Sequence, residues 1–197
     1  MNMRKIAGIT SIILLFLAIY SYSIKSIYWY YIGVIGVWIF FDNLANSRKR
    51  KTTLDLLLQK RYFKFIKLYI LLVILGILIE TIGNWIFGFW SYTYLSKLVE
   101  YITLPIFYPF ILMSFAESYN WVYSFNKNKT YSTILAMIIG IIIWEIPNVY
   151  SKDWIYNAPY FKAQLYGIPI LVIIAWLFLI WAPLYVYKRF ANYDLSK

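Results

Sequence analysis

Six long apolar stretches constrain the fold of this chain more than any other feature. Of its 197 residues, 62% are hydrophobic and only 14% are charged, whereas soluble domains are about half apolar and about a quarter charged. A helix needs about 20 mostly apolar residues to cross the hydrocarbon core of a bilayer. The sequence therefore predicts an all-α polytopic membrane protein with about six transmembrane helices. The predicted spans are residues 6–24, 27–44, 66–86, 101–124, 131–150 and 165–187.

We expect a single transmembrane domain over residues 1–197. The loop between the second and third spans is the most polar stretch, and its Thr52-x-x-Asp55 capping pattern predicts a short amphipathic helix on the inner membrane surface. The first span follows Arg4 and Lys5, so it is alternatively a secretory signal peptide. The three parts of the domain are a helix pair with a basic cytoplasmic loop (1–65), a first helix hairpin (66–130) and a second hairpin (131–197).

The formal charge of +11 indicates how the chain is oriented in the membrane. With the N-terminus in the cytoplasm and six spans, most basic residues fall on the cytoplasmic side, and the positive-inside rule then places both termini there. We expect an integral protein, in the plasma membrane if the chain is prokaryotic, that contacts the lipid bilayer and does not bind nucleic acid. The cytoplasmic set is Arg4, Lys5, Arg48, Lys49, Arg50, Lys51, Lys60, Arg61, Lys64, Lys67, Lys127, Lys129, Lys188, Arg189 and Lys197, and the outer set is Lys25, Lys97, Lys152 and Lys162.

The sequence contains no cysteine and no histidine. This excludes disulfides, thiol nucleophiles, thiolate metal sites and histidine-ligated haem or zinc. Catalytic triads that use histidine are excluded as well. We therefore predict no metal and no cofactor, and any acid–base chemistry must use carboxylates, tyrosine or lysine.

One acidic pattern occurs twice, each time at the outer end of a predicted span. The spacing from Trp to Tyr to Pro is the same in both copies, and the spacing from Glu to Trp differs by a single residue. Because a carboxylate in an apolar segment is costly unless it is used or paired, the repetition predicts a tandem two-helix repeat with a site between its copies, related by an axis along the membrane normal. The first copy is Glu80, Asn84, Trp90, Tyr92 and Pro105, and the second is Glu145, Asn148, Trp154, Tyr156 and Pro169.

The two repeated glutamates, Glu80 and Glu145, are the main candidates for catalysis. Burial in apolar surroundings disfavours the charged form of a carboxyl group, so either could be held protonated and donate a proton. Alternatively, each glutamate only hydrogen-bonds the asparagine that follows it and orders the adjacent loop. The predicted substrate-binding residues are the polar and aromatic members of the two copies: Asn84, Trp90, Tyr92, Asn148, Trp154 and Tyr156.

The other acidic residues have less specific contexts. Glu117 is a third catalytic candidate, which either lines the same cavity from the cytoplasmic side or pairs with a basic residue such as Lys127. Asp42 is predicted to end a helix at the inner interface. Glu100 and Asp153 are predicted to lie in wet outer loops, either solvated or paired with Lys97 or Lys152.

The first copy also contains Gly83, Gly88, Ser91 and Tyr94 between and after its repeated residues. With these residues, the segment resembles the membrane lycopene cyclase domains and the related carotenoid-biosynthesis proteins of the hydratase type. Those proteins share an acid, glycines, a Gly-x-Trp-x-Tyr/Phe segment and a later helix that begins at proline, and they occur as tandem copies. The resemblance covers about residues 78–187 and implies an isoprenoid substrate. The segment reads Glu80-x-x-Gly83-Asn84-x-x-x-Gly88-x-Trp90-Ser91-Tyr92-x-Tyr94, followed by Pro105.

The chain departs from that family just after the proline. Lycopene cyclase domains usually carry an acidic pair there, whereas this chain has Ile106-Phe107 after Pro105 and Ile170-Leu171 after Pro169. A cyclase reaction that requires this pair is therefore not expected.

Three functions remain open. The first is an intramembrane isoprenoid- or carotenoid-modifying enzyme, cyclase- or hydratase-like, in which a carboxylic acid transfers a proton to an alkene. The second is a non-catalytic integral membrane subunit, in which the repeat is architectural. The third is a small carboxylate-based transporter.

Overall fold

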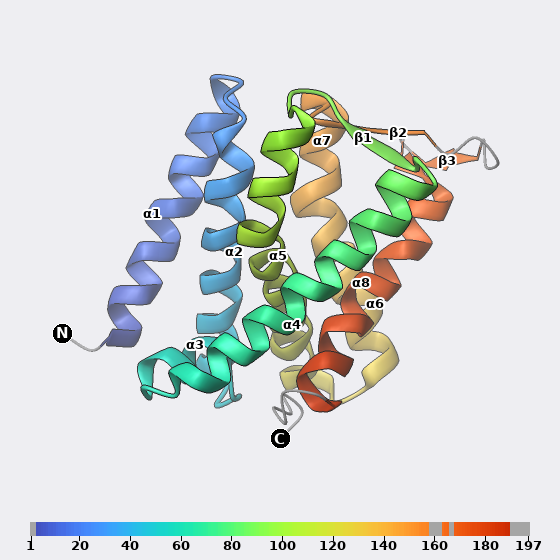
Figure 1. Ribbon diagram of the computed structural model, residues 1–197. Coiled ribbons are helices and arrows are strands. Elements are labelled where there is room, and N and C mark those ends of the chain that lie inside the picture. The colour runs from blue at the N-terminus through green and yellow to red at the C-terminus, as the bar shows by residue number, and fades with distance from the viewer. Residues whose placement is uncertain (1–2, 158–162, 166–167, 190–197) are drawn as a thin grey trace.

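The computed structural model describes residues 3–157, 163–165 and 168–189. Within these residues, six long helical segments stand side by side and alternate in direction along the chain (Figure 1). The all-α prediction is therefore confirmed. The long helices are α1 (Met3–Ser23), α2 (Tyr28–Ser47), α4 (Tyr62–Glu80), α5 (Lys97–Asn126), α6 (Lys129–Gly140) and α8 (Ile170–Arg189).

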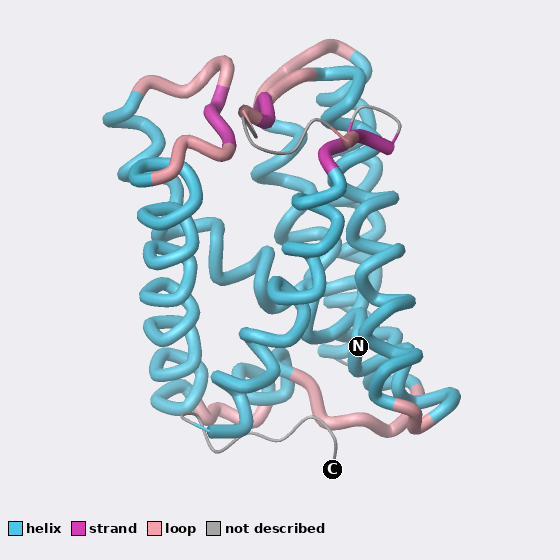
Figure 2. Tube along the Cα trace, turned by 90° about the vertical axis from the view of Figure 1, so that its right-hand side faces the viewer, coloured by secondary structure: helices cyan, strands magenta, loops and turns pink. Residues whose placement is uncertain are grey.

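Short elements lie at both ends of the helices (Figure 2). One end, here called the strand end, holds two small antiparallel strand pairs and two π-helical segments that extend α4 and α6. The opposite end, here called the basic end, holds α3. These elements are α3 (Thr53–Leu58), η1 (Thr81–Ile86), β1 (Trp90–Tyr92), η2 (Ile141–Glu145), α7 (Ile146–Ser151), β2 (Trp154–Tyr156), β3 (Gln164–Leu165) and β4 (Ile168–Pro169).

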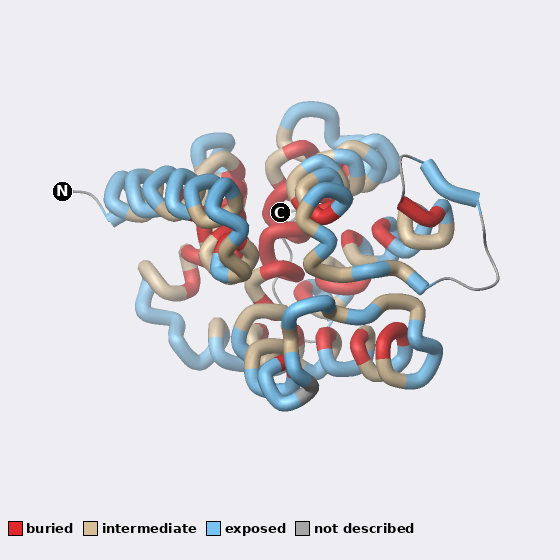
Figure 3. The backbone as a smooth tube through the Cα atoms, turned by 90° about the horizontal axis from the view of Figure 1, so that it is seen from above, coloured by how far each residue is buried: buried red, intermediate tan, exposed pale blue. Residues whose placement is uncertain are grey.

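Five of the described helical segments are long and apolar enough to cross a membrane. Large hydrophobic side chains cover their outer surfaces, and the buried residues lie toward the middle of the bundle when it is seen from above (Figure 3). A bilayer, rather than water, is the solvent that such a surface suits. These five segments are Met3–Ser23, Tyr62–Ile86, Leu98–Asn126, Lys129–Ser151 and Ile170–Arg189.

The predicted span 27–44 forms helix α2, but α2 is not among the five. It is 20 residues long, and its tyrosine, tryptophan and polar residues lower its mean hydropathy. It packs against both α1 and α5, and one of its faces is buried among protein side chains. A helix enclosed in this way needs less apolar surface than a helix that faces lipid.

Two prolines lie inside α5. The helix begins at Lys97, and Pro105 and Pro109 follow about two and three turns later. Because Pro109 has no N–H group, the carbonyl of Pro105 loses its helical partner. The Tyr69 hydroxyl of α4 donates to this carbonyl at 3.1 Å and to that of Ile106 at 2.9 Å. The prolines thus supply acceptors that join α5 to α4.

The basic end is closed by a buried polar network around α3. The predicted capping box of Thr52 and Asp55 is present, although one side of α3 is buried rather than lying free on the membrane surface. Asp42 was predicted to be only a helix-end residue. It is instead fully buried, forms an ion pair with Arg4 and accepts from the Leu54 backbone at 2.7 Å. Arg4 also pairs with Asp55.

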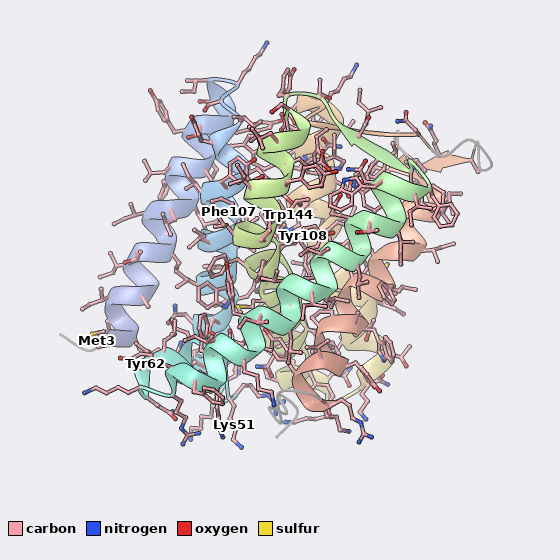
Figure 4. The ribbon with its side chains drawn as sticks, in the orientation of Figure 1. Met3, Lys51, Tyr62, Phe107, Tyr108 and Trp144 are labelled. Atoms are coloured by element: carbon pink, nitrogen blue, oxygen red, sulfur yellow. The ribbon has the colours of Figure 1, made fainter. Side chains whose placement is uncertain are left out.

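Basic side chains gather at this end of the molecule, where Met3, Lys51 and Tyr62 lie in Figure 4. This distribution agrees with the charge asymmetry of the sequence. Lys162, Lys197 and the C-terminal segment 190–197, which the orientation argument also used, lie outside the described residues.

Gly83 allows the Trp90 ring to pack against the backbone at the strand end. The ring occupies the space that a side chain at position 83 would fill. A Cβ atom built on Gly83 would lie 1.9 Å from that ring, and the ring is held by a hydrogen bond from its Nε1 to Glu80. By contrast, a Cβ on Gly8 of α1 would meet no atom within 4 Å.

We therefore expect Gly83→Ala to destabilise the protein by about 1–3 kcal/mol, the usual cost of overpacking, and Gly8→Ala to cause no loss. Thermal unfolding of the purified protein in detergent, followed by tryptophan fluorescence, measures both. Equal melting temperatures for the two variants would contradict the close contact between Gly83 and Trp90.

Candidate functional site

Glu80 is buried at the strand end and held by side chains that follow it in sequence. Its exposed fraction is 1%. The Tyr92 hydroxyl donates to Oε1 at 2.7 Å, and Trp90 Nε1 and Asn84 Nδ2 donate to Oε2 at 3.1 and 3.2 Å. The Tyr108 hydroxyl of α5 also lies beside this carboxyl. Both oxygens of Glu80 are thus engaged by neutral donors.

Glu145 has a similar setting with one difference. It is 2% exposed, and its Oε1 accepts from the Tyr156 hydroxyl at 2.6 Å and from Trp176 Nε1 of α8 at 3.1 Å. Trp154 Nε1 donates to the Tyr156 hydroxyl at 2.8 Å instead of directly to the glutamate. Among the described residues, the buried Oε2 of Glu145 has no hydrogen-bond partner, although the Trp154 side chain lies near this carboxyl.

The two Trp-x-Tyr segments pair with each other as strands β1 and β2. They are antiparallel, and the register sets Trp90 opposite Tyr156 and Tyr92 opposite Trp154. Each strand therefore faces its counterpart in the other copy of the pattern. Additional backbone bonds extend the pair, from Thr93 N to the Asp153 carbonyl at 2.9 Å and from Asn157 N to the Phe89 carbonyl at 2.8 Å. The pairing joins the loop after Glu80 to the loop after Glu145.

The two asparagines do not have equivalent contacts. Asn84 bonds Glu80, as expected, and donates more closely to Glu100 Oε1, at 2.6 Å. Asn148 was expected to bond Glu145, but it bonds the backbone of Trp154 instead, donating to its carbonyl at 2.9 Å and accepting from its N–H at 3.0 Å. The difference arises because η2 ends at Glu145 and α7 follows, so that Asn148 is directed toward β2.

Two acids that were predicted to lie in wet outer loops, either solvated or paired with a lysine, take part in the structure of the strand end. Glu100 is 2% exposed and accepts from Trp85 Nε1 at 2.8 Å in addition to Asn84. Asp153 was predicted to be solvated or paired with a neighbouring lysine. It accepts from Trp29 Nε1 of α2 at 2.6 Å and from the Ser151 hydroxyl at 2.7 Å.

Glu117 belongs to the network at the basic end rather than to the site at the strand end. It accepts from the backbone N–H of Thr53 at 2.8 Å and from Asn120 Nδ2 at 3.1 Å. Glu100 lies 17 residues earlier on the same helix, which corresponds to about 25 Å at 1.5 Å per residue. Glu117 therefore caps α3 and is far from Glu80 and Glu145.

Sequence reasoning missed three aromatic residues at the strand end: Tyr30, Tyr108 and Trp176. Tyr30 packs edge-on against Trp144 and Trp154, with ring centroids 5.3 and 5.5 Å apart, and lies within electrostatic range of both repeated glutamates. Tyr30 precedes the two copies, so no repeat signal marks it. The positions of Tyr108 and Trp176 were indicated only by two glycines, Gly76 and Gly140, each about one helical turn before a glutamate. The rings of Tyr108 and Trp176 pack against these glycines, in the space that a side chain would fill.

Two hollows lie near these residues. The first, here called the tyrosine cleft, lies between α2, α5 and the loops around β1 and β2; its cavity volume is about 40 Å³, and it opens to the surroundings. Figure 4 shows two of its residues, Phe107 and Tyr108, in the upper half of the bundle with Trp144. The aromatic residues that line it are Tyr30, Tyr31, Tyr92, Phe107, Tyr108 and Trp154.

The second hollow, here called the apolar groove, lies between the α1–α2 pair and the η2–α7 segment. Its cavity volume is about 170 Å³, and it is likewise partly open. Trp144, the residue before Glu145, forms part of its wall, and at one edge the Tyr22 hydroxyl donates to the Pro147 carbonyl at 3.1 Å. Other lining residues are Leu15, Ala18, Trp29 and Gly33.

The two tyrosines of β1 and β2 are stabilised as neutral phenols. Burial raises the pKa of Tyr92 well above its usual value, and the charge of Glu80 raises it further. Burial and the charge of Glu145 act in the same way on the pKa of Tyr156. Both hydroxyls therefore keep their protons and remain donors to the glutamates throughout the ordinary pH range.

Comparison of the chain with protein-family models, with curated proteins and with solved structures finds no match.

Because the Tyr92 hydroxyl of β1 donates to the buried Glu80, we expect this hydroxyl to contribute to the stability of the protein. Tyr92→Phe removes the shortest hydrogen bond to Glu80 and leaves a buried carboxyl oxygen without it, so we expect a loss of about 1–3 kcal/mol. Tyr94, two residues later and 64% exposed, provides the matched control, because Tyr94→Phe removes a hydroxyl from a side chain outside the site. Melting temperatures in detergent measure both, and a similar fall in both variants would mean that the Tyr92 hydroxyl does not stabilise the site.

Proposed function

We propose that this chain is an integral membrane enzyme that modifies an isoprenoid-like lipid by proton transfer, with Glu145 as the acid and Glu80 as its anionic partner. The observation that carries the proposal is the buried Oε2 of Glu145, which has no donor among the described residues. A carboxylate oxygen without a donor in apolar surroundings is costly. A protonated oxygen is a donor itself and can pass its proton to a substrate.

The two glutamates differ in a way that suits an acid and a base. Glu80 accepts from three neutral donors, which offset part of the cost of burying its carboxylate form. Glu145 has donors on only one oxygen. Pairs of titratable groups in unlike environments are the usual arrangement for acid–base catalysis.

The reaction needs only groups that the chain possesses. The proton of Glu145 would form a bond to one carbon of an alkene with the π electrons, leaving a positive charge on the other carbon. Loss of a neighbouring proton to the Glu145 or Glu80 carboxylate would restore a neutral alkene, and addition of water followed by loss of one of its protons to the same carboxylates would give a neutral alcohol. The apolar groove, whose wall includes Trp144, the residue before Glu145, is an apolar surface on which such a lipid could lie, and aromatic faces such as those of Trp144 and Trp154 stabilise a cation.

A specific observation favours the alternative of a non-catalytic membrane subunit. Each glutamate is bonded by the tyrosine of its own copy, and neither lines the tyrosine cleft or the apolar groove. In that reading the glutamates organise the strand end for stability or association. The transporter reading lacks such support. Glu117, the third candidate carboxyl, lies at the opposite end of the bundle from Glu80 and Glu145, about 25 Å along α5 from Glu100.

A comparison of lipid extracts separates these readings. Cells that lack the protein are complemented with the wild type, Glu80→Gln, Glu145→Gln or Glu117→Gln, and their apolar lipids and pigments are profiled by mass spectrometry at matched protein levels. For the enzyme, we expect a precursor to accumulate in the deletion and in the Glu80 and Glu145 variants, with conversion about 100-fold or more below wild type for Glu145→Gln.

The Glu117 variant is the control, since its carboxyl lies at the opposite end, and it should keep converting the precursor. An unchanged lipid profile in all strains, with lower stability of the Glu80 and Glu145 variants, would reject the enzyme and support the structural reading.

We also propose that α2 is a sixth span, that both termini are cytoplasmic and that 66–130 and 131–197 are tandem copies. The alternating direction of α1, α2 and α4 supports six spans, and the basic residues at the end that holds α3 support the orientation. The matched contacts of Tyr92 with Glu80 and of Tyr156 with Glu145 support the duplication.

The absence of cysteine makes the orientation easy to test. Lys51 and Tyr94 are exposed residues at the basic and strand ends, so Lys51→Cys and Tyr94→Cys each place a single thiol on one side. In intact cells we expect a membrane-impermeant maleimide to label Tyr94→Cys, and Lys51→Cys only after lysis. Labelling of Lys51→Cys before lysis would reverse the proposed orientation.

A further inference from the structure

The tyrosine cleft combines an aromatic wall with an acidic residue and lacks a basic one. Among the described residues that line it, Asp153 is the only acid and none is lysine or arginine. The rest of its lining is mainly aliphatic, including Ile27, Leu95 and Leu104. The chain has a formal charge of +11, so a cleft with an acid and no basic residue is unusual in it. Such a lining disfavours an anionic ligand.

The charges around the cleft are also negative. The Tyr92 hydroxyl on its wall donates to Glu80 at 2.7 Å, so a carboxyl lies next to the cleft and this hydroxyl is not available to an anionic ligand. Asp153 uses Oδ2 for Trp29 and Ser151. Asp153 lines the cleft, and its side-chain hydrogen bonds leave Oδ1 without a donor among the described residues.

The aromatic rings on the wall form a continuous group. Tyr31 and Phe107 have centroids 4.6 Å apart, and Tyr30 lies 6.0 Å from Tyr31 and 5.5 Å from Trp154. The electron-rich faces of such rings attract cations, and the attraction increases where water is excluded. A hard, strongly hydrated metal ion would need several oxygen ligands, whereas an alkylated ammonium group carries its charge in an apolar shell that suits this lining.

From these contacts we infer that the tyrosine cleft binds an alkylated ammonium group, held by the rings of Tyr30, Tyr31 and Phe107 and by the carboxylate of Asp153. Two sources have this chemistry: the choline headgroup of a phospholipid, and a free quaternary ammonium compound. The inference is independent of proton transfer by Glu145, because Glu145 does not line the cleft.

Choline and its neutral isostere 3,3-dimethylbutan-1-ol test the inference directly. They have the same shape, but only choline is charged, so both are titrated calorimetrically into the full-length protein in maltoside detergent. We expect choline to bind about tenfold or more tightly than the isostere, in line with a cation–π and ion-pair contribution of about 1.4 kcal/mol or more. Equal binding of the two compounds, or no binding of choline, would overturn the inference.

Two variants locate the site. Phe107→Leu keeps an apolar side chain but removes a ring, and Asp153→Asn removes the charge and keeps an oxygen acceptor. We expect choline affinity to fall about 2- to 30-fold in each. Phe63→Leu is the matched control, because Phe63 is 81% exposed and lies at the basic end. Unchanged affinity in both cleft variants would assign the binding elsewhere and overturn the inference, and should Asp153→Asn fail to fold, Phe107→Leu decides alone.

Short-chain phospholipids distinguish the two sources. If dihexanoyl phosphatidylcholine binds more tightly than choline and competes with it, the ligand is a lipid headgroup. If the two bind equally and compete, the ligand is a free cation. Dihexanoyl phosphatidylglycerol carries no ammonium group, and if it competed with choline as well as phosphatidylcholine does, the ammonium specificity would be wrong.

Discussion

The structure depends on the rule that a buried carboxyl group away from water must find its hydrogen bonds within the protein. The chain satisfies this rule differently at its two ends. At the basic end, Arg4 supplies a positive charge to Asp42. At the strand end, Glu80 and Glu145 are bonded mainly by tyrosine and tryptophan. Neutral donors occupy both oxygens of Glu80 but only one oxygen of Glu145, and none of them carries a positive charge, which is why we locate both proposed chemistries at the strand end.

The features that could be predicted from sequence are those set by local composition or by short spacing. Apolar length identified the helices, and the capping pattern identified α3. The Trp-x-Tyr segments were found as neighbours of the glutamates because they follow them by 10 to 12 residues in the first copy, close enough for a short loop to return them. The composition of α2 was harder to interpret, since tyrosine and tryptophan in a helix suit both a membrane interface and a protein interior.

Contacts between distant segments could not be predicted. Asp153 meets Trp29 across 124 positions, and Thr53 meets Glu117 across 64, so no local pattern indicates that these acids have partners. Asn148 was misassigned for a different reason. One residue fewer separates Glu145 from Trp154 than Glu80 from Trp90, and in the second copy α7 occupies this interval, so the asparagine is directed toward the strand backbone. Equivalent positions in two similar sequences therefore have different partners.

The contacts of Arg4 also bear on how the protein is assembled. Its two acidic partners lie 38 and 51 positions farther along the chain, on α2 and at α3. Synthesis proceeds from the N-terminus, so α1 and α2 emerge from the ribosome before the second partner exists. The first helical hairpin can therefore insert before Arg4 has both of its acidic partners. Its full set of contacts forms only after the segment that leads into the next hairpin has been synthesised.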